Sequence, residues 1–543
     1  MDQLDIIPGT DIIYANGEDG DNSNDPILIP QPTANSDDPL NWSKTWKTTV
    51  IVNQCVFVFV SILTPLAVTP MTPILEAEFH KTLPEVNMLL GAAAITLGYA
   101  NFLIVPAANV FGRRPVIIVC GLVCILANVW QALVTSFPSF VGARVVSGLG
   151  AAANESIMPM VVADLLFQHQ RGSSIALYFW AYFLGLFIGP IIAGALAAKL
   201  SWRWFFWVCT LLQGASFIFV LIAHPETKYK RPSAPSTSPC PSPTTAITRV
   251  NANDNILISN SGPPSPKPEA EHLSSTSSYQ APAPLTALSH SHSSGRPSTW
   301  QFSLLRLPEK LSLASLLRDI IAPWRILFCF PIVTWAALAM GFSANSLLTL
   351  NLTQEQVFRT PAYGFGPEQI GYVNIAFAVG AGIALVTAGP FSDMVTLRRA
   401  RRTGVLEAEM RLPALIPYIC ANVVGMVVVA VGCERGWAWE VIIVLGYTLV
   451  GIQVVGIPTI AIAYAVDCYK TLTGEIMLAA TIARNTFGFG MIFFFNDWVA
   501  SDGYLGPILT LMASTVGICI IGLVVFIPFG KQFRRWTKDY DHS

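Results

Sequence analysis

Long runs of uncharged, mostly apolar residues recur along the chain and are separated by short polar segments. A helix needs about 20 apolar residues to cross the hydrocarbon core of a membrane. Because lipid cannot satisfy free backbone groups, such runs are expected to be helices, whereas barrel strands would be shorter and would alternate. The pattern predicts an all-α polytopic membrane protein with twelve transmembrane helices in two six-helix halves. The predicted spans are 48–75, 86–112, 115–143, 144–162, 172–198, 204–223, 326–354, 369–392, 412–433, 441–466, 476–496 and 503–530.

The spans divide the chain into an N-terminal tail (1–46), a six-helix half (47–223), a linker (224–323), a second half (324–530) and a C-terminal tail (531–543). Ser, Pro, Thr and Ala dominate the middle of the linker, so we expect that part to be largely disordered. Its end has a helical spacing of apolar residues, which fits either an amphipathic helix on the inner leaflet or an early start of the seventh span. These residues are Leu313, Leu316, Leu317, Ile320 and Ile321.

The distribution of basic residues predicts the orientation. Most Lys and Arg residues of the short loops and tails fall on one side of the predicted membrane, together with both termini. Because basic loops stay in the cytoplasm, we expect both termini to be cytoplasmic. The first 46 residues are polar and acidic, which does not fit a cleavable signal peptide.

Composition excludes several classes of function. Only 12% of the residues are charged, against about 25% in soluble proteins, and 53% are hydrophobic. The 32 basic and 33 acidic residues give no excess charge for nucleic acid. The ten cysteines lack metal-site or disulfide spacing, so no cofactor or metal is expected. Neither a nucleophile motif nor a phosphate-binding glycine loop is visible, which argues against an enzyme and against ATP-driven transport.

Local motifs resemble those of the major facilitator superfamily. The segment Gly185–Gly194, with Gly189 and Pro190, is similar to the GxxxGPxxGG signature associated with proton-coupled antiporters, although Ala193 replaces one glycine. Small residues one turn apart also serve ordinary helix packing. Arg144, Gly148 and Gly150 match the family's RxxxGxG motif in the fourth span. The resemblance implies the major facilitator fold.

The same resemblance implies gating residues in two cytoplasmic loops. Arg113 and Arg114 end the first gating loop, whose earlier positions depart from the family pattern. The matching loop of the second half retains Asp393, so the gate is expected to depend more on Asp393 and the cluster Arg398–Arg402. Two acid–base pairs at the inner helix ends, Asp164 with Arg171 and Asp467 with Lys470, either close the gate or are simply solvated.

A narrower resemblance covers most of the predicted ordered chain. It points to the fungal twelve-span drug:proton antiporters, including the branch of the polyamine- and histidinol-permeable yeast carrier. The resemblance implies a plasma-membrane protein that exchanges small organic molecules for protons. The segments that carry it are 38–43, 154–156, 164–172, 202–207, 225–229 and 409–413.

Three charged residues stand out at membrane depth: Arg144, Glu155 and Arg484. Charges there cost at least about 2.5–3.5 kcal/mol on insertion scales, so each requires a reason. Arg144 and Glu155 are eleven residues apart, which places them on one helix face, with small residues between them that could line a cavity. We expect Glu155 to exchange its proton for substrate; the alternative is that it only locks two helices. Arg484, followed by Asn485, either binds an anionic substrate or is the counter-ion of Glu155.

Together these features predict a secondary active transporter that works by alternating access in the lipid bilayer. The favoured function is proton-coupled efflux of a small organic molecule, and the alternative is uptake of a cationic nutrient such as a polyamine. A non-transporting membrane sensor is the rival from another class. The sequon at Asn351 also predicts a glycan on the outer side.

Overall fold

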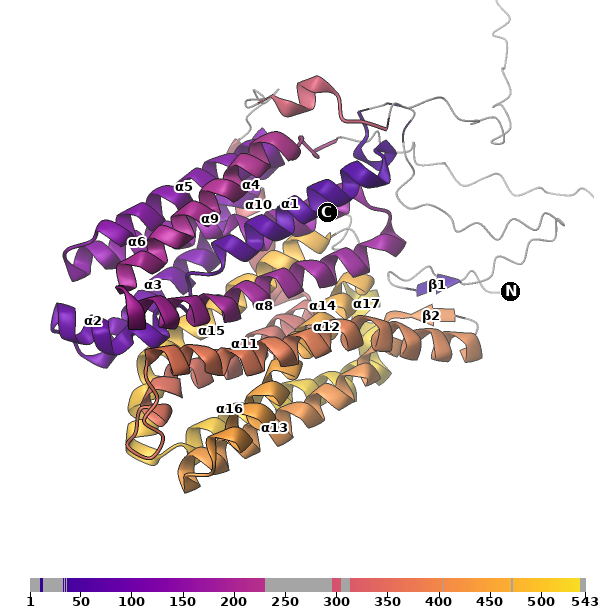
Figure 1. Cartoon of the computed structure of the whole chain (residues 1–543). Coiled ribbons are helices and arrows are strands. Elements are labelled where there is room, and N and C mark those ends of the chain that lie inside the picture. Colours follow the sequence, from indigo (N-terminus) through magenta and orange to yellow (C-terminus); the bar gives the residue numbers. More distant parts are fainter. Residues whose placement is uncertain are drawn as a thin grey trace, which may run out of the picture. The chain divides into compact units, whose positions relative to one another are not determined.

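The computed structural model describes residues 10–12, 33, 35, 37–229, 295–303, 313–403, 405–469 and 472–537, which are mainly helical (Figure 1). The N-terminal half consists of α1 Lys44–Ser61, α2 Thr72–Phe79, α3 Leu83–Tyr99, α4 Asn101–Phe111, α5 Arg113–Leu133, α6 Phe137–Ala151, α7 Ala153–Leu165, α8 Gln168–Lys199 and α9 Trp202–Ala223. The linker helix is α10 Leu313–Cys329. The C-terminal half consists of α11 Pro331–Phe358, α12 Pro367–Thr403, α13 Ile416–Arg435, α14 Thr448–Cys468, α15 Thr473–Asp502, α16 Leu505–Ile521 and α17 Ile527–Trp536.

Within the described part of the chain, eleven helical spans are long and apolar enough to cross a membrane, from Leu83–Phe111 to Leu505–Trp536. Several contain two consecutive helices, as α3 and α4 do. The 18-residue α1 precedes them and takes the place of the first span. The prediction of an all-α protein with twelve transmembrane helices is therefore confirmed. Two three-residue strands, β1 Thr10–Ile12 and β2 Val405–Glu407, pair in antiparallel fashion and do not alter this class.

The first predicted span is wrong in its second half. A continuous helix was expected over 48–75, but α1 ends at Ser61, and the short turns that follow lead into α2. The cause is the series Pro65, Pro70 and Pro73. Each proline lacks a backbone N–H and disfavours helical geometry in the residue before it. The break leaves backbone carbonyls inside the bundle that need other donors.

The two halves meet along two helix pairs. The antiporter-motif helix α8 packs along α12, and α3 packs along α15. In Figure 1, α1, α5, α6 and α9 lie in the upper part of the bundle, and α11, α12, α13 and α16 in the lower part. We call the end of the bundle where α1 begins and α17 ends the tail side, and the other end, where α2 lies, the α2 side.

The described ends of the linker are hydrogen-bonded to the N-terminal half on the tail side. The amide of Ser43 donates to the carbonyl of Gly295 at 2.7 Å, and the amide of Glu226 donates to that of Gln301 at 2.8 Å. Helix α10 is separate from α11, because Phe330 adopts an extended conformation between them. This agrees with the interpretation as a distinct amphipathic helix. The predicted disorder of the linker falls on 230–294 and 304–312, which lie outside the described residues.

Candidate substrate and proton-coupling site

A buried ion pair joins the two halves in the middle of the bundle. Glu155 on α7 is 1% exposed, and its Oε1 forms a salt bridge with Nη2 of Arg484 on α15. Asn485 donates through Nδ2 to the other carboxylate oxygen at 3.2 Å. Of the two roles considered for Arg484, the structure shows that of counter-ion. It also brings Asn485, the residue after Arg484, to the same carboxylate.

Tyr182 on α8 completes the cluster and was not identified from the sequence. Its hydroxyl donates to Oε1 of Glu155 at 3.0 Å. The guanidinium carbon of Arg484 lies 5.1 Å from the centre of the Tyr182 ring, within the range of a cation–π contact. Tyr182 lies one helical turn before Gly185, so the antiporter-motif helix also carries a ligand of the ion pair. We call Glu155, Tyr182, Arg484 and Asn485 the central cluster.

Buried polar groups without partners accompany the central cluster. In the described part of the chain, the side-chain amide of Asn154 and the hydroxyl of Ser156 have no hydrogen-bond partner. The same holds for the amide of Asn53 on α1, a helix that packs against α7. An unsatisfied buried polar group costs about 1–3 kcal/mol, so water or a ligand is its expected partner. These residues are candidates for substrate contact.

Arg144 does not join this cluster. Its guanidinium donates to the carbonyls of Leu89 at 3.0 Å, Thr64 at 3.1 Å and Pro65 at 2.9 Å. Two of these carbonyls belong to the break after α1, so Arg144 fastens that irregular segment to α6. The shared face predicted for Arg144 and Glu155 therefore does not bring them together.

The small residues between them pack rather than line a cavity. A Cβ on Gly148 would lie 2.6 Å from the carbonyl oxygen of Ala93 on α3. Ala151 and Ala152 are buried as well. The expectation that this face lines a cavity is wrong for Gly148, because α3 occupies the space.

The antiporter motif places α8 between α1 and α12. A Cβ on Gly185 would lie 2.5 Å from the carbonyl oxygen of Phe59, and one on Gly189 would overlap that of Leu63. Farther along α8, Gly194 contacts the carbonyl of Pro367. A Cβ on Gly371 of α12 would lie 2.8 Å from the carbonyl of Pro190. The glycines thus permit close approach both within the N-terminal half and to the C-terminal half.

On the tail side of the N-terminal half, Arg113 pairs with Asp164, with Nε 3.2 Å from Oδ2. The predicted partner of Asp164 was Arg171, whose side chain lies outside the described residues. Glu226, after α9, accepts the backbone amides of Arg113 at 2.9 Å and of Arg114 at 3.1 Å. The Arg114 side chain donates to carbonyls at the end of α9. Arg114 therefore ties α5 to α9 instead of pairing across a gate.

His224 lies in the same region and is fully buried. Burial and, to a smaller extent, the nearby Arg114 guanidinium lower its pKa to about 3. His224 therefore remains neutral at physiological pH.

The corresponding network in the C-terminal half is centred on Arg411, which was not predicted as a gating residue. Its guanidinium lies 3.1 Å from Asp393 and 3.0 Å from Asp467. The expected partners Lys470, Arg401 and Arg402 have side chains outside the described residues. Near Arg411, Glu409 and Arg534 form a buried two-contact ion pair at 2.9 and 2.7 Å. Glu409 lies in the segment 409–413, which carries part of the family resemblance, but nothing in the sequence indicates that it pairs with Arg534.

The predicted glycan at Asn351 is incompatible with the fold. Asn351 lies within α11 and is 0% exposed, and its Nδ2 donates to the carbonyl of Leu347 at 3.1 Å. A sequon must be accessible to accept a glycan. We expect enzymatic deglycosylation to leave the electrophoretic mobility of the protein unchanged, and Asn351→Gln to migrate like the unaltered chain. A mobility shift that disappears in Asn351→Gln would contradict this placement.

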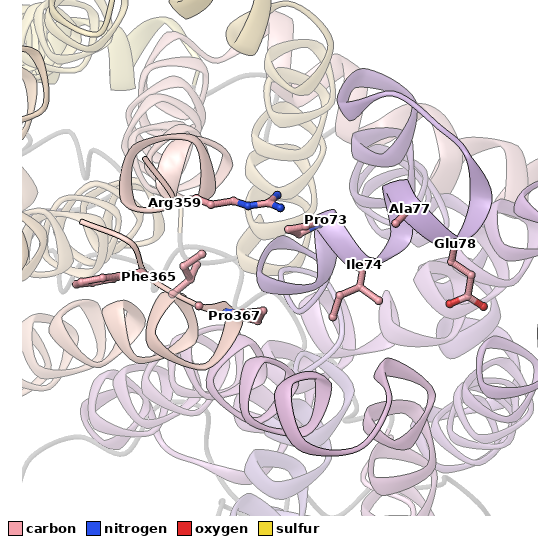
Figure 2. A pocket seen from close by; sticks show the side chains of 9 residues that line it. Pro73, Ile74, Ala77, Glu78, Arg359, Phe365 and Pro367 are labelled. Carbon is pink, nitrogen blue, oxygen red and sulfur yellow. The ribbon is translucent and has the colours of Figure 1, made fainter. Parts of the chain in front are cut away.

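An open groove of about 660 Å³ lies on the α2 side, away from the central cluster (Figure 2). Pro73, Ile74 and Glu78 of α2 form one wall, and Arg359 and Phe365 lie on the other. Glu78 is paired with Arg203 at 2.8 Å, and Arg359 with Glu355 at 3.1 Å. The charges of Glu78 and Arg359 are thus partly neutralised by their partners. No residue of the central cluster lines this groove.

Comparisons with known proteins agree with this architecture. The sequence model described as Major Facilitator Superfamily matches residues 54–494. Protein HOL1 of Saccharomyces cerevisiae is 27% identical, covering 99% of this chain and 97% of its own. The probable efflux pump mfs2 of Aspergillus flavus is 24% identical, covering 87% of this chain and 99% of its own. The crystal structure of the human organic anion transporter MFSD10 is similar with a TM-score of 0.53 at 14% identity, over 88% of this chain and 99% of that one.

Proposed function

Because the chain belongs to the major facilitator superfamily, we propose that it exchanges a small organic molecule for protons, with Glu155 as the coupling carboxylate. It is a multi-pass membrane transporter and not an enzyme. The observation that carries the proposal is the buried ion pair between α7 and α15, which lie in different halves. Carriers of this architecture place their site between the halves near the middle of the membrane.

The chemistry of the pair provides a switch. A proton on Glu155 removes the charge that holds Arg484, so the link between α7 and α15 weakens. Loss of the proton restores the attraction and draws the halves together. Because a buried charge without a partner is costly, the cluster favours either the ion pair or the protonated carboxyl with a substrate nearby. Transport and proton transfer are thereby coupled.

We assign the tail side to the cytoplasm, since most loop and tail Lys and Arg residues are on that side. The plasma membrane is the proposed location. We keep the N-terminal half proposed from the sequence at 47–223, and extend the C-terminal half, expected at 324–530, to begin with α10 at Leu313. The proposed direction is efflux, which is supported by the described function of the Aspergillus flavus relative.

The test uses proteoliposomes that contain a pH-sensitive dye, challenged in turn with cationic drugs, polyamines and fungal metabolites. We expect one class to trigger proton movement in the unaltered protein, and Glu155→Gln to abolish that movement. Glu368→Gln is the matched control, because Glu368 is a carboxylate at the α2 side, where it pairs with Lys199 at 3.1 Å and accepts the Tyr372 hydroxyl at 2.7 Å, away from the central cluster. Proton flux that survives in Glu155→Gln, with unchanged pH dependence, would refute the role of Glu155.

A second candidate is uptake of a cationic nutrient driven by protons or by the membrane potential. The same cluster supports it, because Glu155 can serve as counter-charge for a substrate cation that displaces Arg484. Potential-dependent uptake of a labelled polyamine without proton movement would favour this function. Any substrate-dependent flux would exclude a non-transporting sensor.

A further inference from the structure

The linker helix α10 belongs structurally to the C-terminal half. Ile326 of α10 and Phe330, which follows the helix, belong to the main apolar core. The centre of the Phe330 ring lies 5.1 Å from that of Tyr469. Helix α10 also packs against α11 and α15. It therefore moves with the C-terminal half when the two halves separate.

Helix α10 also packs against α4 of the N-terminal half, and Trp324 is the side chain that makes a described ring contact there. The Trp324 ring stacks on Phe102 of α4, with centroids 5.6 Å apart and an angle of 12° between the planes. Trp324 also stacks on Phe328, with centroids 6.1 Å apart and an angle of 8° between the planes. Phe328 is itself 75% exposed, so Trp324 contacts one ring of α4 and one ring at the surface.

The surroundings of this stack form an apolar closure between the halves. Val105 of α4 lies in one buried cluster with Leu478 and Ile482 of α15, and Met160, Phe102 and Trp324 pack against it. Along α15, Leu478 and Ile482 come between the start of the helix at Thr473 and Arg484 of the central cluster. Opening a path from the central cluster to the tail side along the α4–α15 seam therefore requires the Phe102–Trp324 contact to separate.

We infer that Trp324 is a positioning residue of the transport cycle, which holds the tail side closed by stacking the linker helix of one half onto α4 of the other. The inference deepens the proposed function, because it concerns the conformational step of the same carrier. The linker thereby contributes a side chain to the closure as well as a covalent connection. Residue 324 sets how often the tail side opens.

The experiment measures opening directly, in nanodiscs and without substrate. Val105→Cys reports the tail-side seam, in a background where the exposed Cys329 and Cys420, the partly exposed Cys55 and Cys433, and Cys240 of the linker are replaced by serine. We expect Trp324→Ala to accelerate labelling of Cys at 105 by a membrane-impermeant thiol reagent by about two- to tenfold, the size expected for one aromatic pair. Trp324→Phe should restore most of the protection, because it keeps a ring on Phe102.

Two controls separate a specific closure from general loosening. Ile321→Ala alters the same helix at a residue that is 58% exposed, and it should leave labelling unchanged. A second reporter, Ile370→Cys on the α2 side, should not label faster in Trp324→Ala, whereas a loosened protein would expose both reporters. Unchanged labelling at 105 in Trp324→Ala, or equal acceleration at both reporters, would overturn the inference. Neither result depends on proton coupling, so a failure of Glu155 as coupling residue would appear only in the flux assay.

Discussion

Arg484→Ala is expected to abolish transport and to lower the stability of the folded protein by about 3–5 kcal/mol, the cost of leaving one charge of a buried pair without its partner. Glu155 would then remain in the bundle with only Tyr182 and Asn485 as donors. Thermal unfolding followed by size-exclusion chromatography measures the stability, and proton flux in proteoliposomes measures the activity. Arg484→Lys should retain more of both, because it keeps the charge.

The double variant Glu155→Gln with Arg484→Gln separates the two effects. Replacing both charges removes the unpaired group, so most of the lost stability should return. Transport coupled to protons should not return, because no titratable carboxyl remains in the central cluster. If the double variant regains proton-coupled flux, the pair is only a structural lock. If Arg484→Ala is as stable as the unaltered chain, the contact with Glu155 contributes little to the fold.

The membrane architecture could be predicted from the sequence because lipid imposes a simple rule on length and polarity. Which charged residues pair with each other was harder to predict from the sequence. Few charged residues lie at membrane depth, so Glu155 and Arg484 were recognised as candidates. Their contact depends on how α7 and α15 are rotated, which periodicity alone does not determine. The Tyr182 hydroxyl was missed for the same reason, since aromatic residues are common in every span.

Contacts between residues far apart along the chain were harder to predict. Asp164 pairs with Arg113, 51 residues away, which the sequence did not indicate, while the predicted pair with Arg171 involves a side chain outside the described residues. Arg144 was assigned to a site with Glu155, although two of its acceptors are carbonyls in the break after α1, 79 and 80 residues earlier. The prolines that cause this break were visible in the sequence. The sequon at Asn351 is a three-residue pattern that carries no information about burial.

Gly189→Ala is expected to impair folding and transport together, because the added Cβ would overlap the carbonyl oxygen of Leu63 on α1. That carbonyl belongs to backbone, which cannot rotate away as a flexible side chain can. Overfilling a packed interface typically costs about 1–3 kcal/mol. The displacement would also be felt at Tyr182, on the same helix, and so at the carboxylate of Glu155. The measurements are the yield of monodisperse protein and the substrate-triggered proton flux.

Gly214→Ala is the matched control, since a Cβ at that position in α9 would meet nothing within 4 Å. It should fold and transport like the unaltered chain, which would show that loss of a membrane glycine is not harmful in itself. If Gly189→Ala were equally silent, α8 and α1 could separate without consequence. The antiporter motif would then not act through close helix packing. If Gly189→Ala instead folds normally but loses only proton flux, the contact with α1 serves the conformational cycle more than the stability of the bundle.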